Sequence, residues 1–167
     1  CIRDRTEIVR RSSAKLGVQV DDDSAQEIST RSRGTPRIAN NLLRWVRDYA
    51  TSKYDGQVDL EITRAALEMA GIDALGLDRQ DRKYLETLMR VFGGGPAGIE
   101  AIAHTMNTAT DTLADEVEPF LLRSELVIRS PRGRMATASA FQHLGITPSA
   151  KNGPQPTDEE QGRLFDP

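Results

Sequence analysis

Residues 31–49 read RSRGTPRIANNLLRWVRDY, and this stretch decides the fold. Gly34 suits the left-handed residue that ends a helix, Thr35 suits an N-cap, and Pro36 suits the first helical position. Apolar residues then recur at i, i+4, i+7 and i+11. This spacing predicts an amphipathic helix whose buried face carries Ile38, Leu42, Trp45 and Tyr49. On that expectation, Trp45→Ala would open a core cavity and cost about 3–5 kcal/mol.

The same helix begins with a basic residue, Arg37, on a polar face that continues through Asn41, Arg44 and Asp48. A cation in the first turn opposes the helix dipole at a cost of about a few tenths of a kcal/mol. Helix N-termini supplemented by a cation suit phosphate, so an anion at this end would explain the residue. The alternative is an ordinary solvated arginine.

The longer string GTPRIANNLLRWVRDYA, residues 34–50, resembles the second sensor motif in the lid domain of RuvB. RuvB-family proteins are bacterial AAA+ motors that drive Holliday junction branch migration. In that family the arginine of GTPR reaches the nucleotide phosphates, so the resemblance implies that Arg37 binds ATP phosphates. Helices are predicted over 6–16, 24–32, 35–52 and 63–70, with a short extended piece at 58–62. They indicate a four-helix lid bundle over residues 1–72.

The second half predicts a winged helix-turn-helix over residues 78–148, after a linker at 73–77. Helices are expected at 78–92, 99–106, 111–123 and 138–144, and strands at 126–129 and 134–137 around the turn Ser-Pro-Arg-Gly. Pro119 should kink or interrupt the third of these helices. Three strings resemble the RuvB C-terminal domain: DRKYLETLMRVFGGGPAGIEAIA (81–103), EPFLL (118–122) and RSPRGRMATASAFQHLGITP (129–148). The predicted fold is therefore mainly α, with a β-hairpin wing.

Catalytic machinery for ATP hydrolysis is not visible in the sequence. No GxxxxGK[ST] string occurs, and Gly93–Gly95 has no following lysine, so this run is interpreted as a break between helices. The chain begins at Cys1 without Met, and we expect a fragment. The resemblance implies that ATP or ADP with Mg²⁺ is bound mostly by a large domain absent here. The fragment alone is predicted to be inactive, with no complete catalytic set.

The DNA-binding residues are expected on the hairpin. The helix at 111–123 is acidic, and its Asp111, Asp115, Glu116 and Glu118 would repel phosphates. Arg129 and Arg134 should face each other across the ladder, with Arg132 at the tip. Opposed like charges are destabilising, so either a bound anion explains them or they are solvated charges that protect a strand edge. The resemblance favours duplex DNA, contacted through its backbone without sequence specificity.

Composition narrows the remaining possibilities. The net charge is −3, so no global basic field is present, but residues 91–122 carry −5 and residues 123–134 carry +3. One cysteine excludes an intrachain disulfide, no metal-ligand spacing occurs, and no apolar run suits a membrane span. We expect a cytoplasmic protein. The polar tail, 149–167, is predicted to be disordered. Its Gln161–Phe165 is similar to short peptides that dock on sliding clamps, but five residues with three fixed positions are a weak signal, and a chance match is the simpler explanation.

Two function classes compete. The first is a fragment of a RuvB-type motor, for which the resemblance implies a homohexameric ring on the duplex DNA of a Holliday junction. A RuvA-type junction-binding partner is implied as well. The second is a stand-alone winged-helix regulator without ATPase activity, which predicts sequence preference and dimerisation. A non-catalytic interaction module that uses the tail is a third, weaker option.

Overall fold

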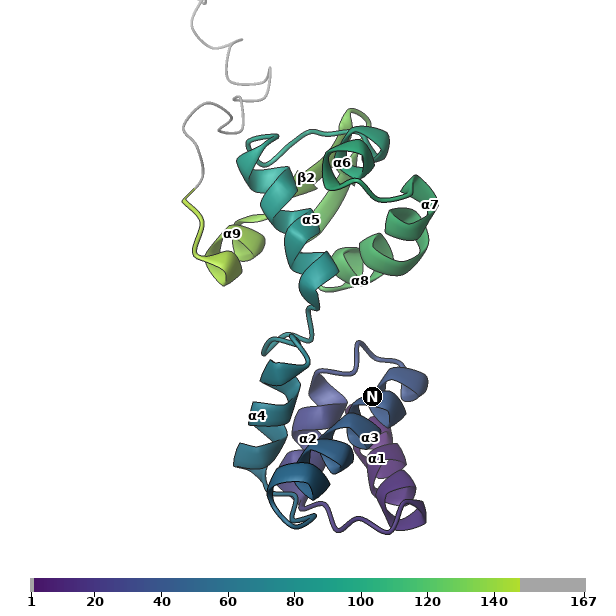
Figure 1. The fold of residues 1–167 in the computed structure, drawn as a ribbon. Coiled ribbons are helices and arrows are strands. Elements are labelled where there is room, and N and C mark those ends of the chain that lie inside the picture. The colour runs from purple at the N-terminus through teal and green to yellow at the C-terminus, as the bar shows by residue number, and fades with distance from the viewer. Residues whose placement is uncertain (1, 148–167) are drawn as a thin grey trace, which may run out of the picture. The chain divides into compact units, whose positions relative to one another are not determined.

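The computed structural model describes the backbone of residues 2–147 and the side chains of residues 6–147. It divides into two compact units, with the boundary between Arg79 and Gln80. Each unit is described by itself (Figure 1). The tail at 149–167, with its clamp-like Gln161–Phe165, lies outside the described residues. Among the helices that are described, none is both long and apolar enough to cross a membrane.

The first unit is the predicted four-helix bundle, and this prediction is confirmed. Its helices are α1 (Ile2–Lys15), α2 (Asp22–Thr30), α3 (Pro36–Lys53) and α4 (Leu60–Met69). Two of them begin at aspartate caps: the Asp21 carboxylate accepts a hydrogen bond from Ser24 N, and that of Asp59 accepts one from Ile62 N. Each cap satisfies a backbone donor that the helix itself leaves unpaired.

The core of this unit lies between α3 and the other three helices (Figure 1). It is made of small and branched apolar side chains, namely Val9, Ala25, Ile28, Ala39, Leu42, Leu43, Val46, Ala50, Val58, Ala66 and Leu67. The extended piece expected at 58–62 is shorter than predicted. Val58 forms an isolated parallel bridge with Val20, and α4 already begins at Leu60.

Helix α3 starts where the sequence predicts, but one of its supposed core residues lies outside. Gly34 has a φ of 76°, and Thr35 is the N-cap, although its side chain makes no capping hydrogen bond. Trp45 is 43% exposed. Its indole Nε1 donates to Ala66 O at 2.7 Å, so the ring lies along α4 and covers the core from outside. The expectation of a buried Trp45 is therefore wrong.

Residues 73–77, predicted as a linker, form an ordered loop that packs on the first unit. The Asp73 carboxylate accepts hydrogen bonds from Leu75 N and Leu77 N. The loop approaches the bundle at Gly76, where a Cβ would lie 2.7 Å from Arg31 O, and the Arg31 guanidinium donates to Ile72 O just before the loop. Residues 73–77 are therefore part of the first unit and are held to the lid bundle by these contacts.

The second unit has the order of a winged helix-turn-helix, as predicted. Its elements are α5 (Arg79–Arg90), α6 (Ile99–Met106), α7 (Thr110–Thr112), the π-helical turn η1 (Leu113–Val117), α8 (Glu118–Arg123), β1 (Val127–Ser130), β2 (Gly133–Ala136) and α9 (Ala138–Leu144). The expected helix at 111–123 is thus interrupted. Its second α-helical part begins at Glu118–Pro119, which confirms the predicted effect of the proline.

Replacing Trp45 should now cost less than replacing its fully buried neighbour Leu43. We expect Leu43→Ala to lower the free energy of unfolding by about 2–5 kcal/mol through a core cavity. We expect Trp45→Ala to lower it by about 1–2 kcal/mol, because the ring contributes one hydrogen bond and partial burial. Chemical denaturation followed by far-ultraviolet circular dichroism measures both. An equal or larger loss for Trp45→Ala would show that the ring is a core residue after all.

Candidate functional sites

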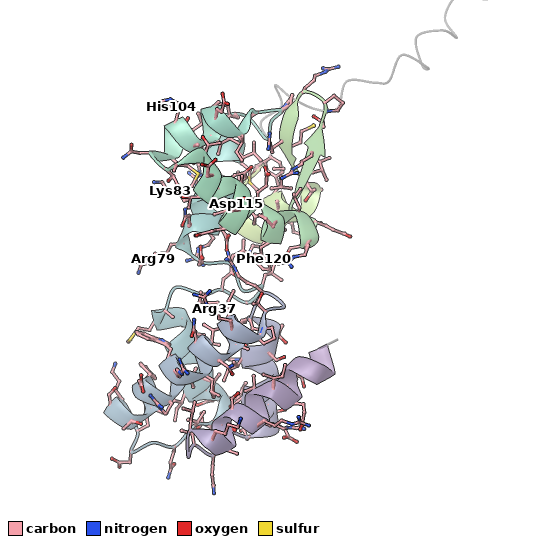
Figure 2. All side chains as sticks on the ribbon, turned by 90° about the vertical axis from the view of Figure 1, so that its right-hand side faces the viewer. Arg37, Arg79, Lys83, His104, Asp115 and Phe120 are labelled. Atoms are coloured by element: carbon pink, nitrogen blue, oxygen red, sulfur yellow. The ribbon has the colours of Figure 1, made fainter. Side chains whose placement is uncertain are left out.

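The first candidate, Arg37, lies in the first turn of α3 (Figure 2). Its side chain is exposed, and it makes no ion pair with any residue that the structure describes. Pro36 contributes no N–H and Thr35 gives no side-chain cap, so this helix end keeps its partial positive charge. The arrangement leaves a guanidinium beside an uncapped helix N-terminus, which suits an anionic group.

The second candidate is the hairpin, whose register is the one predicted. Strands β1 and β2 pair antiparallel with Arg129 opposite Arg134 and Ser130 opposite Gly133. The Ser130 hydroxyl donates to Gly133 O at 2.9 Å across the turn. At the tip, Arg132 is exposed and has no ion pair within the described part of the chain.

The segment that follows the glycine run and precedes α6 pairs with strand β2 of this hairpin through an isolated bridge between Ala97 and Arg134. Ala97 N donates to Arg134 O at 3.0 Å, and Arg134 N donates to Ala97 O at 2.8 Å. This approach requires residues without a Cβ. A Cβ at Gly95 would lie 2.2 Å from Arg134 O, and one at Gly133 would lie 2.5 Å from Ala97 O. Gly93–Gly95 therefore separates two helices, as predicted, and also brings the backbone against β2.

The two opposed arginines converge on a carboxylate within the protein, that of Glu118. This side chain is 0% exposed. Arg134 Nε donates to Glu118 Oε1 at 2.6 Å and Arg134 Nη2 approaches Oε2 at 3.4 Å, while Arg129 Nη2 donates to Oε2. The Tyr84 hydroxyl, from α5, donates to Oε1 at 3.2 Å. These four residues, called the wing cluster below, join four elements of the second unit, namely α5, α8, β1 and β2.

Electrostatics in the wing cluster favour the charged form of the acid. Burial raises the pKa of Glu118, but hydrogen bonds and charge from Arg134 and Arg129 outweigh it and hold the pKa below its usual range. The hydrogen bond to Glu118 raises the pKa of Arg134 in turn. Burial, with the neighbouring carboxylate, raises the pKa of the Tyr84 hydroxyl, which stays protonated as a donor. The cluster is thus one anion between two cations, with a net charge of +1.

Glu118 is the site residue that sequence reasoning missed. It was predicted to lie with Asp111, Asp115 and Glu116 on a face that repels DNA, whereas only those three are exposed. The π-helical turn explains the difference, since Glu118 N donates to Leu113 O, one residue further back than in an α-helix. That wider turn shifts Glu118 toward the buried face. The opposed arginines Arg129 and Arg134 were the available signal, because they predict a nearby anion, and that anion is the carboxylate of Glu118.

The three predicted hairpin arginines therefore differ in their surroundings. Arg132 is exposed at the tip and free of the cluster. The Arg129 side chain is 56% exposed and makes one contact with Glu118, whereas the Arg134 side chain is 23% exposed and makes two. Arg132 and Arg129 are thus exposed, whereas Arg134 is partly buried. The acidic helix presents Asp115 to solvent (Figure 2).

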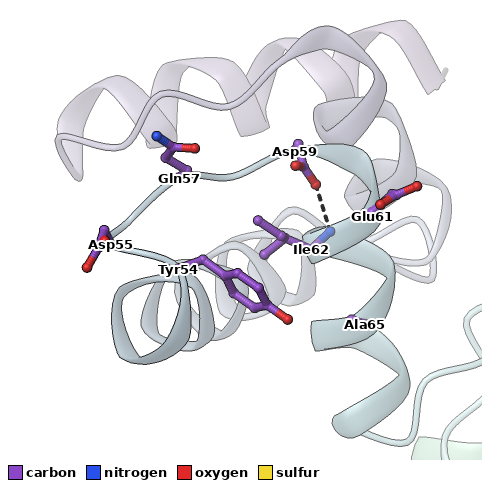
Figure 3. Close-up of a pocket in the computed structure, with 7 residues that line it drawn as sticks. All are labelled: Tyr54, Asp55, Gln57, Asp59, Glu61, Ile62 and Ala65. Atoms are coloured by element: carbon purple, nitrogen blue, oxygen red, sulfur yellow. Dashed lines mark hydrogen bonds between the residues drawn. The ribbon is translucent and has the colours of Figure 1, made fainter.

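A hollow beside the start of α4 does not include Arg37 in its lining. Its volume is about 590 Å³ (Figure 3), and it is lined by Tyr54, Asp55, Gln57, Asp59, Glu61, Ile62 and Ala65. Its carboxylates would repel an anionic ligand, and that of Asp59 is already used as a helix cap. Within residues 6–147, His, Cys, Asp and Glu side chains form no group of three or more that could hold a metal ion.

Neutralising Glu118 should lower stability in a pH-dependent way. Because its folded-state pKa lies below the usual value, its stabilising effect is present above the unfolded-state pKa of about 4.5 and is lost as pH falls through the folded-state value. At pH 7 we expect Glu118→Gln to lower the unfolding free energy by about 1.5–3 kcal/mol. Urea denaturation of both proteins between pH 7 and pH 3 measures the gap. A gap that does not narrow in acid would contradict the charged-cluster account.

Two family descriptions match the chain in succession. Residues 2–73 match the RuvB AAA lid domain, and residues 74–145 match the RuvB C-terminal winged helix domain. A Holliday junction branch migration complex subunit RuvB from Rhodopirellula baltica is 63% identical over 142 residues, which are 85% of this chain and 39% of that protein. Its counterpart from Streptomyces coelicolor is 49% identical over 158 residues, covering 95% of this chain and 43% of that protein.

The fold of the chain is also similar to that of a solved RuvB structure. The Thermotoga maritima RuvB Holliday junction branch migration motor superposes with a TM-score of 0.85 at 37% identity, over 88% of this chain and 49% of that one. The chain thus spans less than half the length of each of these proteins. Because the two matched domains follow each other over nearly all the described residues, the chain belongs to the RuvB family, as its AAA lid and C-terminal winged helix.

Proposed function

We propose that this chain is the lid and winged-helix part of an ATP-driven motor for Holliday junction branch migration. The observation that carries the proposal is the succession of the two RuvB domains, each presenting an exposed arginine at the predicted place: Arg37 in the lid and Arg132 on the wing. On this proposal the boundaries near residues 72 and 78 separate two functional parts, and the loop between them connects nucleotide state to DNA contact.

Arg37 is proposed to contact nucleotide phosphate. An exposed guanidinium at an uncapped helix N-terminus fits a phosphate by charge and by geometry. Its contribution would be electrostatic stabilisation of phosphate charge, so its contact would also depend on whether the γ-phosphate is present. The remaining contacts to ATP or ADP and to Mg²⁺ would come from a large domain outside this chain.

The wing is proposed to contact the backbone of duplex DNA. Arg132 at the tip and the exposed part of Arg129 supply positive charge, whereas the exposed Asp111, Asp115 and Glu116 make the neighbouring helix a poor reader of base edges. Arg134 is assigned mainly to holding the wing. Backbone contacts without base contacts suit a motor that must move over any sequence.

The partners of the assembled protein belong to the same proposal. They are a homohexameric ring, a RuvA-type junction-binding protein and the Holliday junction itself, and the expected compartment is the cytoplasm. Sliding-clamp binding through Gln161–Phe165 remains a separate hypothesis. Replacing Leu164 and Phe165 by alanine should abolish binding if it exists, and a wild-type tail that does not bind would end it.

Arg37→Ala should impair ATP turnover in the protein at the full length of its relatives. We expect kcat to fall by about a hundredfold, because one preorganised cation is removed from the phosphate charge. Steady-state phosphate release measures the effect, and circular dichroism checks the fold. Arg44→Ala is the matched control, since Arg44 is also exposed on α3 and one positive charge is lost in both. Unchanged turnover with Arg37→Ala would remove this residue from the mechanism.

Arg132→Ala should weaken duplex binding equally for unrelated sequences. Loss of one phosphate contact reduces the slope of log K against log salt by about 0.9. Fluorescence anisotropy with several duplexes over a salt series measures both quantities, with Arg44→Ala on the lid as the charge-matched control. A loss confined to one sequence would favour the stand-alone regulator instead, because base reading would then be involved.

A further inference from the structure

We propose that Glu118 is an internal counterion of the wing. It competes with DNA phosphate for Arg129, whereas its ion pair with Arg134 is retained when DNA binds. This inference rests on the proposed DNA contact of the wing and names its regulating residue. A carboxylate and a phosphate bind guanidinium groups through the same pattern of two oxygens facing N–H donors. Glu118 therefore already occupies, from inside the protein, one Arg129 donor, Nη2, that a phosphate oxygen would take.

The two arginines are held unequally. Arg134 directs both Nε and Nη2 at the carboxylate, and its side chain is 23% exposed. Its backbone N–H and C=O both form hydrogen bonds with Ala97. Arg129 uses Nη2 alone, and its side chain is 56% exposed. The exposed Arg129 guanidinium can turn outward by side-chain rotation and loses one contact, whereas Arg134 would have to give up two contacts with Glu118 from a less exposed position. Arg129 is therefore the exchangeable partner.

The exchange leaves no buried charge without a partner. When Arg129 moves to a phosphate, Glu118 Oε1 still accepts from Arg134 Nε at 2.6 Å and from the Tyr84 hydroxyl at 3.2 Å, and Oε2 keeps Arg134 Nη2 at 3.4 Å. A buried carboxylate that lost its only cation would carry a large desolvation cost. The second arginine and the tyrosine remove that cost. They make Arg129 available to DNA at the expense of one hydrogen bond.

As a consequence, Glu118 lowers the affinity of the wing for DNA. An Arg129–phosphate contact through Nη2 replaces the Arg129–Glu118 contact, so only the difference between the two adds to affinity. A translocating protein must release each phosphate to reach the next one, and an internal competitor at the contact residue makes release easier. Glu118 would thus set the affinity of the wing without touching DNA.

The first test compares two glutamate substitutions that change the charge identically. Glu116 lies two residues away, is exposed, and has no ion pair among the described residues. We expect Glu118→Gln in the 167-residue chain to bind mixed-sequence duplex DNA about tenfold more tightly, the effect of removing one charge-assisted hydrogen bond that competes with binding. Glu116→Gln should change the dissociation constant less than about twofold. Anisotropy titration measures both, and equal effects of the two would overturn the proposal.

The second test does not require Glu118→Gln to fold. We expect Arg129→Gln to reduce the salt slope of duplex binding by about 0.9 with little change in melting temperature. We expect Arg134→Gln to lower the melting temperature while leaving the slope unchanged. Identical slopes for wild type and Arg129→Gln, or a slope change confined to Arg134→Gln, would overturn the assignment of the exchangeable arginine.

Failure of the proposed function can be told apart from failure of this inference. If the wild-type chain binds no duplex DNA at low salt, the DNA-binding wing is wrong and the competition falls with it. If wild type binds and Arg132→Ala weakens that binding, the wing is a DNA contact. Equal affinities of Glu118→Gln and Glu116→Gln would then overturn the counterion role alone.

Discussion

The buried carboxylate of Glu118 constrains the whole second unit, because a charge withdrawn from water must be satisfied from several sides at once. Tyr84 satisfies it from α5, and Arg129 and Arg134 satisfy it from the hairpin. The hairpin is thereby fixed to the helices through polar contacts as well as through its buried Val127. This arrangement also removes the difficulty of two arginines placed opposite each other, since their mutual repulsion is offset by the anion between them.

The same constraint explains why the glycine run is shaped as it is. Arg134 can direct its side chain at Glu118 only if β2 is held in place, and the Ala97 bridge holds it from the side opposite β1. That bridge needs backbone contact closer than any Cβ allows at Gly95 and Gly133. The glycine run at Gly93–Gly95 therefore does more than separate two helices. It allows the close backbone packing that holds β2 in place.

In the lid, by contrast, the candidate charged residue lies outside the apolar core. Its core consists of aliphatic side chains from all four helices, while Arg37 projects from the start of α3. Packing and site are therefore separable here: substitution of Arg37 should leave the bundle intact. In the second unit they overlap, since Arg134 supports the hairpin on which Arg132 is displayed.

The sequence by itself determined the elements and their local register. The start of α3 follows from Gly34 and Pro36, and the four-residue turn at 130–133 places Arg129 opposite Arg134, because these features act through neighbouring backbone. Tertiary structure decided which charged and aromatic side chains are buried. Trp45 lies outside because α4 offers it a carbonyl acceptor, and Glu118 lies inside because a π-helical turn shifts its phase and two distant arginines meet it. Helical periodicity cannot reveal either, since both depend on partners that are far away in the sequence.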